Sequence, residues 1–280
     1  MVRKLLCVIA LFIWISIVTG CNLVGSGSGT DTLTVDSVRY TLSDSLVTCE
    51  IVADIPRGDD SLAVNVRAFI NDQLDSLSGA SMYRSSVRPR FMADPSEAQA
   101  MIDFYGVMNA DSLKAIRGQW ADVTAAPYSY SASVRLSAET GTYVTYDMFS
   151  YVYTGGAHGS AVSYSRNIIK PSGKVLAQSV DTAKVREMQP LLVRGVRGYL
   201  GRHGVKSEDA LKGLFVDNGV IPLPAFPPYL TPEGLNFIYQ QYEIGPYAIG
   251  MVSFTIPYEE AKAFMTAEAL QLIEGSDTEK

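Results

Sequence analysis

Apolar and polar residues alternate at several places along the chain, and this alternation predicts β-strands. The pattern is clearest between Tyr128 and Leu136, where apolar residues occupy every second position and serines and an arginine occupy the others. A period of two is typical of a strand with one face on a core and the other in water. Further strands are predicted at Leu33–Tyr40, Leu46–Ile55, Tyr143–Tyr153, Ser160–Ile169, Leu235–Tyr239 and Met251–Ile256.

A helical period, with apolar residues three and four positions apart, runs from Leu62 to Leu77. Asp94 is followed by a proline and then by an acidic third residue, which predicts the start of another helix, and Leu113–Trp120 is expected to lie on a separate one. Pro190 is expected to end a helix and begin the next. The remaining helices are predicted at Asp181–Gln189, Pro190–Leu200, Ser207–Leu214 and Tyr258–Ile273, the last with a break near Thr266.

Strands and helices are mixed without a regular β-α-β order, so the predicted class is α+β, with mainly antiparallel sheets and packed helices. A chain of 280 residues holds one large domain or two small ones. We expect a two-part module, with an N-terminal α+β domain at residues 33–140 and a C-terminal α+β domain at residues 141–275.

The first 21 residues have the pattern of a targeting segment. Two basic residues precede the apolar run Leu5–Val18, which is too short to span a bilayer and is typical of a secretory signal. Val18–Cys21 resembles the bacterial lipoprotein box, which implies removal of residues 1–20 and lipid attachment at Cys21. The alternative is an ordinary signal peptide. Residues 21–32, rich in glycine and serine, are expected to form a flexible tether.

This reading places the protein in the cell envelope, lipid-anchored to a bacterial membrane and facing the periplasm. The chain carries 23 basic and 29 acidic residues, a net charge of −6. An acidic chain disfavours nucleic-acid binding and favours a basic partner. The only histidines, His158 and His203, lie far apart, and the cysteines are few, so we expect no metal site, no cofactor and no disulfide framework. Cys49, within an alternating run, is expected to be a buried, inert thiol.

The segment Tyr153–Gly159 joins an aromatic strand end to a glycine pair and a histidine. Gly155 and Gly156 predict a turn with positive φ and exposed N–H groups. His158 is a candidate general base, and Ser160 is a candidate nucleophile on the same side of the following strand. The alternative, which we favour, is a structural corner with a hydrogen-bonded imidazole, because the sequence fixes no acidic partner for it.

The segment Tyr242–Gly250 is the second unusual motif. Pro246 and two glycines shape a loop that enters the next strand. Glu243 is expected to pair with His158 across the sheet, either as a buried polar tie or as a catalytic dyad. Tyr247 belongs to a second half dense in tyrosine, a residue that fills half-buried strands but also forms protein interfaces and stacks on sugar rings.

Together, Tyr153–His158 and Tyr242–Gly250 resemble the hallmarks of the RsiV-like family, catalogued as domain of unknown function 3298. Glu233–Leu235 and Ile256–Tyr258 also fit the family pattern, and the resemblance extends over Tyr143–Phe264. The segment before it, from residue 33 to residue 136, more weakly resembles the companion domain numbered 4163.

The resemblance implies a two-part extracytoplasmic module. In an anti-sigma factor of this family the module binds lysozyme as a sensor, and in some peptidoglycan deacetylases it accompanies a separate catalytic domain. The sequence shows neither an anti-sigma segment nor the zinc motifs of a deacetylase, so only a recognition role carries over.

We therefore expect a cell-envelope lipoprotein that recognises a protein such as lysozyme, or a cell-wall glycan such as peptidoglycan, without catalysis. The alternative is a metal-independent hydrolase of envelope polymers that uses His158 with Glu243 or Ser160. A polar cleft around His158 would favour the enzyme, and a sealed His158 beside an exposed tyrosine patch would favour binding.

Overall fold

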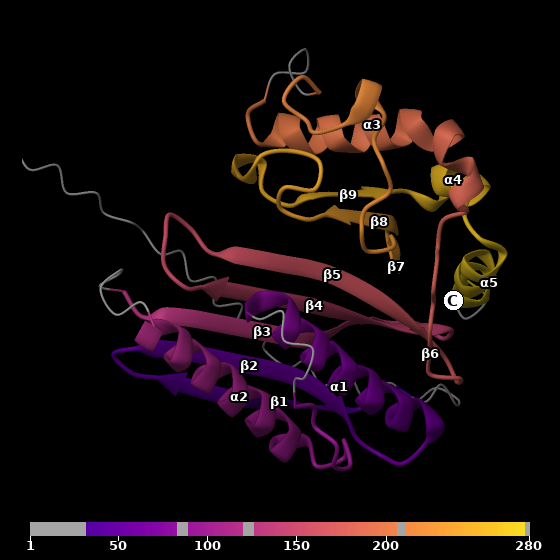
Figure 1. Ribbon diagram of the computed structural model, residues 1–280. Coiled ribbons are helices and arrows are strands. Elements are labelled where there is room, and N and C mark those ends of the chain that lie inside the picture. The colour runs from indigo at the N-terminus through magenta and orange to yellow at the C-terminus, as the bar shows by residue number, and fades with distance from the viewer. Residues whose placement is uncertain (1–31, 83–88, 120–125, 206–210, 278–280) are drawn as a thin grey trace, which may run out of the picture. The chain divides into compact units, whose positions relative to one another are not determined.

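The computed structural model describes residues 32–82, 89–119, 126–205 and 211–277 (Figure 1). The predicted signal peptide, the predicted lipidation site Cys21 and nearly all of the predicted tether lie outside these residues. Residues 32–280 form one compact unit. In the described part of the chain, no helix is long and apolar enough to span a membrane.

Six strands form one sheet in the order in which they occur along the chain. All neighbouring strands are antiparallel except the second and third, which are parallel. The strands are β1 (Val35–Ser43), β2 (Val47–Pro56), β3 (Tyr128–Glu139), β4 (Tyr143–Tyr153), β5 (Ser160–Ile169) and β6 (Lys174–Val175).

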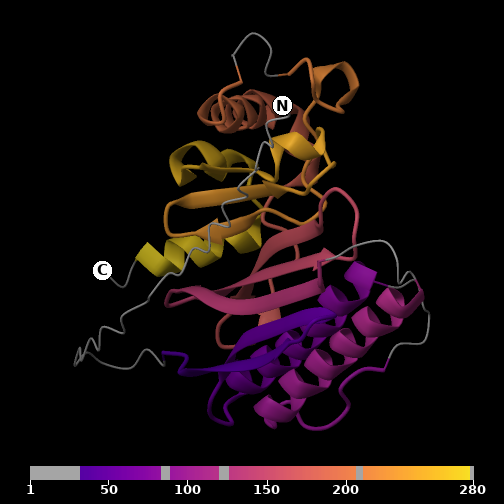
Figure 2. The same cartoon turned by 90° about the vertical axis from the view of Figure 1, so that its left-hand side faces the viewer.

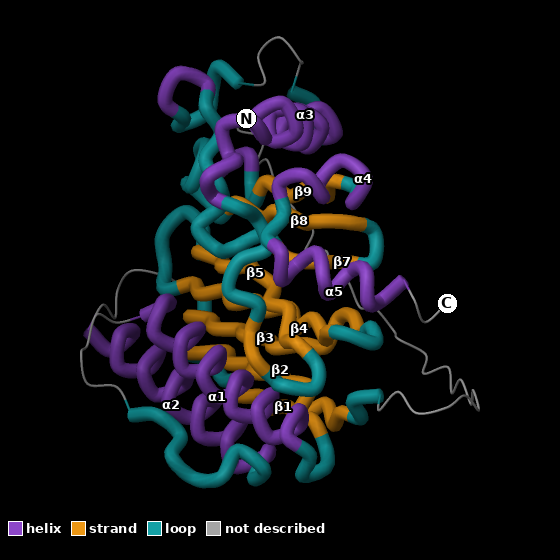
Figure 3. The backbone as a smooth tube through the Cα atoms, turned by 90° about the vertical axis from the view of Figure 1, so that its right-hand side faces the viewer, coloured by secondary structure: helices purple, strands orange, loops and turns teal. Residues whose placement is uncertain are grey.

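Two long helices, α1 (Ser61–Met82) and α2 (Ala98–Gln119), connect the parallel strands and cover one face of the sheet (Figures 1 and 3). The first core lies between these helices and the sheet. Alternate residues of β3, such as Tyr130 and Val134, point into this core, while the serines between them lie on the other face. The half-buried strand that the alternation predicts is therefore confirmed.

A second sheet is antiparallel, in the order β7 (Tyr229–Thr231), β8 (Gly234–Tyr239) and β9 (Val252–Ile256). Helix α3 (Val185–Arg202) packs on β9, and the second core lies between this sheet and its helices (Figure 2). The shorter elements are η1 (Thr182–Lys184), η2 (Asp217–Gly219), η3 (Tyr247–Ile249), α4 (Tyr258–Ala261), η4 (Lys262–Phe264) and α5 (Ala267–Asp277).

The predicted α+β class with mainly antiparallel sheets is confirmed by this architecture. The division expected between residues 140 and 141 falls in the turn between β3 and β4, which pair along almost their whole length. Strands from both sides of that division therefore belong to one sheet. The two cores are divided further along the chain, because most of the second core comes from residues after β6.

Two helix boundaries were predicted wrongly. Asp94 accepts a hydrogen bond from the Ser96 N–H at 2.8 Å in a separate turn, and α2 begins at Ala98 and continues through the position where a second helix was expected. Pro190 lies inside α3 and does not divide it. It removes one N–H donor, and the carbonyl that this N–H would serve belongs to the exposed Arg186, which solvent reaches.

The final helical segment breaks near Thr266, as predicted. The helix predicted at Ser207–Leu214 falls partly outside the described residues, and Leu211–Gly213 form a turn.

Candidate functional site

His158 lies in the connection between β4 and β5 and is exposed. Its ring stacks on Tyr247, with centroids 3.7 Å apart and planes inclined by 17°. Its Nε2 atom lies 3.4 Å from the hydroxyl of Tyr242, a side chain that is 55% exposed. The Tyr242 and Tyr247 centroids are 5.7 Å apart. We call these three residues, His158, Tyr242 and Tyr247, the aromatic platform.

The glycines of the first motif shape the backbone beside the platform. Gly155 and Gly156 have φ of 96° and 93°, so the predicted turn with positive φ is present. The Tyr153 hydroxyl donates a hydrogen bond to the Gly156 carbonyl at 3.2 Å. Gly159 is buried against Tyr151, whose ring would collide with any side chain at this position. The motif therefore brings an aromatic strand end close to the histidine.

The second motif supplies the other two rings of the platform. Tyr242 has a positive φ of 66°, and Pro246 precedes the short helix η3, which begins with Tyr247. The loop is held from behind, because the Tyr199 hydroxyl on α3 donates to the Ile249 carbonyl at 3.0 Å. Tyr247 is thus positioned by the second core, whereas His158 is positioned by the six-stranded sheet.

The expected pairing of Glu243 with His158 is wrong. The two carboxylate oxygens of Glu243 accept hydrogen bonds from the backbone N–H groups of Ala225 and Gln240, each at 2.6 Å. The His158 Nδ1 atom instead lies 2.9 Å from the Gly159 carbonyl. Glu243 thus stabilises its own loop by accepting two backbone hydrogen bonds. The sequence does not reveal these partners, because they depend on the folded backbone.

Ser160 is exposed at the first position of β5 and pairs with Val152 of β4. A serine nucleophile needs a base that is held by a third, acidic group. The carboxylate considered for that role is engaged elsewhere, and His158 is neither sealed nor set in a polar cleft. The geometry around His158 is that of an exposed stack of rings.

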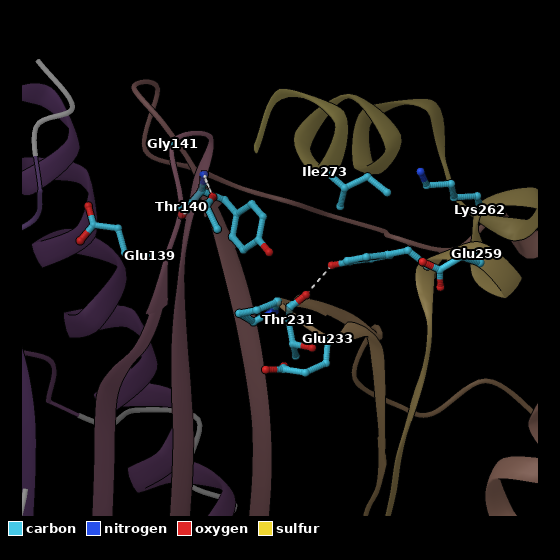
Figure 4. A pocket seen from close by; sticks show the side chains of 11 residues that line it. Glu139, Thr140, Gly141, Thr231, Glu233, Glu259, Lys262 and Ile273 are labelled. Atoms are coloured by element: carbon cyan, nitrogen blue, oxygen red, sulfur yellow. Dashed lines mark hydrogen bonds between the residues drawn. The ribbon is translucent and has the colours of Figure 1, made fainter. Parts of the chain in front are cut away.

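Sequence reasoning missed a cavity of about 480 Å³ at the opposite end of the β3–β4 hairpin (Figure 4). Figure 4 shows Thr140 and Gly141 on one side of the cavity, with Glu259 and Lys262 on the other. Its lining is Glu139, Thr140, Gly141, Tyr143, Thr231, Pro232, Glu233, Tyr258, Glu259, Lys262 and Ile273.

The tyrosines of this cavity serve the fold. The Tyr258 hydroxyl donates to the Thr231 carbonyl at 2.6 Å, and burial raises the pKa of both Tyr143 and Tyr258. Glu139 pairs with Lys170 and is also bound by a backbone amide. Tyr258 and Glu233 belong to segments that fit the family pattern, and this was the only sign in the sequence that the cavity residues matter. The sequence around each segment does not show that the two lie together in the fold.

Cys49 is buried, as predicted, and burial raises the pKa of its thiol to about 12, which disfavours the reactive thiolate. Among the described residues, no group of three or more histidine, cysteine, aspartate or glutamate side chains is arranged to hold a metal ion.

Comparison with known proteins gives the chain a family context. Residues 227–259, which run from before β7 into α4 and include both platform tyrosines, match the model of a family described as "Protein of unknown function (DUF3298)". No curated protein matches the chain.

Two solved structures share the fold. A DUF3298 family protein from Pseudomonas aeruginosa PAO1 is 15% identical, with a TM-score of 0.55, over 86% of this chain and 97% of that one. A member of the same family from Bacteroides fragilis NCTC 9343 is 20% identical, with a TM-score of 0.60, over 90% of this chain and 100% of that one. The chain therefore contains a segment similar to DUF3298 and has the fold of solved DUF3298 proteins.

Proposed function

We propose that this chain is a cell-envelope lipoprotein whose folded part is a non-catalytic recognition module. Its ligand is a protein such as lysozyme or a cell-wall glycan such as peptidoglycan. In this proposal residues 33–136 are the counterpart of the 4163 companion domain, and Tyr143–Phe264 are RsiV-like. The observation that carries the recognition role is the aromatic platform.

The exposure of the platform is what supports binding. Tyrosine rings are large and mostly apolar, and exposed rings that gather in one place are typical of binding surfaces. Tyrosines are also enriched at the centres of protein interfaces, where a ring covers area with little loss of side-chain entropy. Here the stack of His158 on Tyr247 keeps the exposed rings in a fixed arrangement before any ligand arrives.

The lipid anchor at Cys21 would keep the module near the membrane. A flexible tether of 11 or 12 residues has a root-mean-square length of about 20 Å. The protein would then sample ligands close to the membrane surface. Replacement of Cys21 by alanine should release the protein from membranes, and unchanged partitioning of that variant into detergent would contradict the anchor.

Hydrolysis by His158 is the weaker alternative, because Glu243 binds backbone amides and gives the imidazole no orienting carboxylate.

The test is calorimetric titration of the full-length protein in detergent with lysozyme and, separately, with soluble peptidoglycan fragments. We expect binding of at least one ligand, weakened about tenfold in Tyr247→Ala by loss of a ring from the interface. His203→Ala is the matched control, because His203 also stacks on a tyrosine, Tyr199, at 4.1 Å but far along the chain. Absence of binding to both ligands, with hydrolysis that depends on His158, would overturn the proposal.

A further inference from the structure

The face of the six-stranded sheet opposite α1 and α2 carries a row of aromatic side chains on β4. Val152 and Met148 point into the first core, so the alternating residues Phe149, Tyr151 and Tyr153 lie on the other face. Phe149 is 39% exposed, and the two tyrosines are half-buried. Successive rings of such a row are about 6.6 Å apart, since each strand residue advances by about 3.3 Å.

A ladder of serines on β3 runs beside this aromatic row. Ser129, Ser131 and Ser133 lie opposite Tyr153, Tyr151 and Phe149 in the register of the two strands. All three serines are partly exposed, and none of their hydroxyls hydrogen bonds to another residue in the described part of the chain. The ladder therefore presents donors and acceptors that a ligand can use.

Two ion pairs lie on this face, whereas Asp147, in the same row of β4 as Phe149, accepts a hydrogen bond from the neutral Ser165 hydroxyl at 2.6 Å. Arg39 pairs with Glu50 at 2.5 Å, and Arg135 pairs with Asp54 at 2.8 Å. Beside the first pair lies a shallow groove of about 190 Å³, bordered by side chains that include Ser131 and Tyr151. A surface with paired charges offers little net attraction to an ionic ligand.

We propose that this face binds a linear, uncharged glycan. The inference rests on the proposed recognition function and names its ligand class. Pyranose rings present apolar C–H faces, which pack on aromatic rings, and hydroxyl edges, which hydrogen bond to serine hydroxyls. A row of rings beside a row of hydroxyls offers both kinds of contact along the length of such a chain. A basic protein would instead require several unpaired carboxylates, and Glu50 and Asp54 on this face are each held in an ion pair.

The row continues to the aromatic platform. Tyr151 lies against the backbone of Gly159, the residue after His158, and His158 stacks on Tyr247. A glycan that follows β4 would thus pass from Phe149 to the platform without crossing a charged gap. The platform then provides the end of one extended site.

The experiment measures binding of the full-length protein in detergent to two uncharged probes, a hexamer of β-1,4-linked N-acetylglucosamine and cellohexaose, with heparin as the charged comparison. We expect a hexamer to bind and heparin not to bind. Phe149→Ala, Tyr151→Ala and Ser131→Lys should each weaken hexamer binding about tenfold, since each removes a stacking ring or blocks the groove. Val107→Ala is the control, because Val107 is 49% exposed and lies on α2, which covers the opposite face of the sheet (Figure 1).

Phe149→Ala and Ser131→Lys change side chains at the surface, so they carry the test if Tyr151→Ala does not fold, and a melting curve of each variant checks this. Lysozyme binding without hexamer binding would overturn the glycan inference and leave the recognition function standing. Hexamer binding that survives both surface variants, or that is equally lost in Val107→Ala, would overturn the assignment to this face. Failure of every ligand would overturn the recognition function as well.

Discussion

The two ends of strand β5 both touch the second core, but through opposite kinds of contact. Near the C-terminal end, Asn167 is 2% exposed, and its amide donates to the Thr145 hydroxyl and to the Leu230 carbonyl, each at 2.9 Å. Its carbonyl oxygen accepts from the Leu230 N–H at 2.7 Å. Just before the N-terminal end, His158 stacks on Tyr247 in contact with solvent.

The difference separates structural from functional contacts. A buried amide with three partners stabilises the fold, because each partner would otherwise be buried without a hydrogen bond. Opening an exposed ring stack costs little free energy, because water solvates the groups that lose their partner. Between the two ends, the Gln240 side chain binds Ser163 of β5 through both of its amide atoms, at 3.0 and 2.7 Å. The C-terminal end of β5 is thus part of a buried junction, whereas its N-terminal end borders a surface that a ligand can reach.

The largest expected effect is at the sealed end. Asn167→Ala should lower the free energy of unfolding by about 2–4 kcal/mol, since it leaves both backbone groups of Leu230 buried and unpaired. Urea denaturation measures this. Gln99→Ala is the control, because Gln99 is an exposed amide that also makes two hydrogen bonds, and its loss should cost under about 1 kcal/mol. An equal loss in the free energy of unfolding for the two variants would contradict the expected difference between buried and exposed hydrogen bonds.

The glycine turn before the platform should show an intermediate effect. Gly156→Val should destabilise by about 1–3 kcal/mol, because a β-branched residue resists positive φ. No atom lies within 4 Å of a Cβ placed at this position, so the cost is conformational and not a collision. Gly201→Ala, on α3 with equally open surroundings, should instead stabilise by about 0.5–1 kcal/mol. Thermal melts of both variants should therefore shift in opposite directions.

Tyr164, in the middle of β5, points into the first core and allows burial on that face of the strand to be tested by pH. Burial raises the pKa of Tyr164 to about 12, above the ordinary value of 10.0 that it would have in the unfolded chain. The unfolded chain then loses this proton first, so the contribution to stability is complete below pH 10 and is lost as the pH rises toward 12. Melting temperatures measured across this range should fall less steeply in Tyr164→Phe. An unchanged slope in that variant would show that Tyr164 does not contribute.

The smallest effect on stability is expected at the exposed end. His158→Ala should lower the free energy of unfolding by under about 1 kcal/mol, because its Nδ1 contact is only to the adjacent Gly159 carbonyl and the ring is exposed. His203→Ala should behave similarly in stability, and only His158→Ala should weaken ligand binding. A loss above about 2 kcal/mol for His158→Ala alone would make the histidine a structural corner.

Much of the local structure follows from the sequence alone. The strands at Tyr143–Tyr153 and Ser160–Ile169 have the predicted bounds, because alternation between core and water is a property of each segment and its two faces. The burial of Cys49 and the positive φ of the Gly155–Gly156 turn follow in the same way. Helix ends were less predictable, since Pro190 is tolerated inside α3, where the carbonyl that it leaves without a partner belongs to the exposed residue Arg186.

Only the tertiary structure decided which distant residues meet. Tyr242 lies 84 residues after His158 along the chain, and Glu243, its neighbour, turns to backbone amides instead of the histidine. The order of strands in the sheet places the serines of β3 beside the rings of β4, and the packing of the two cores places Tyr247 on His158. The sequence determined the faces of each strand and the turn between them, because these depend on neighbouring residues. The partners across space depend on the packing free energy of the whole fold, which no local pattern contains.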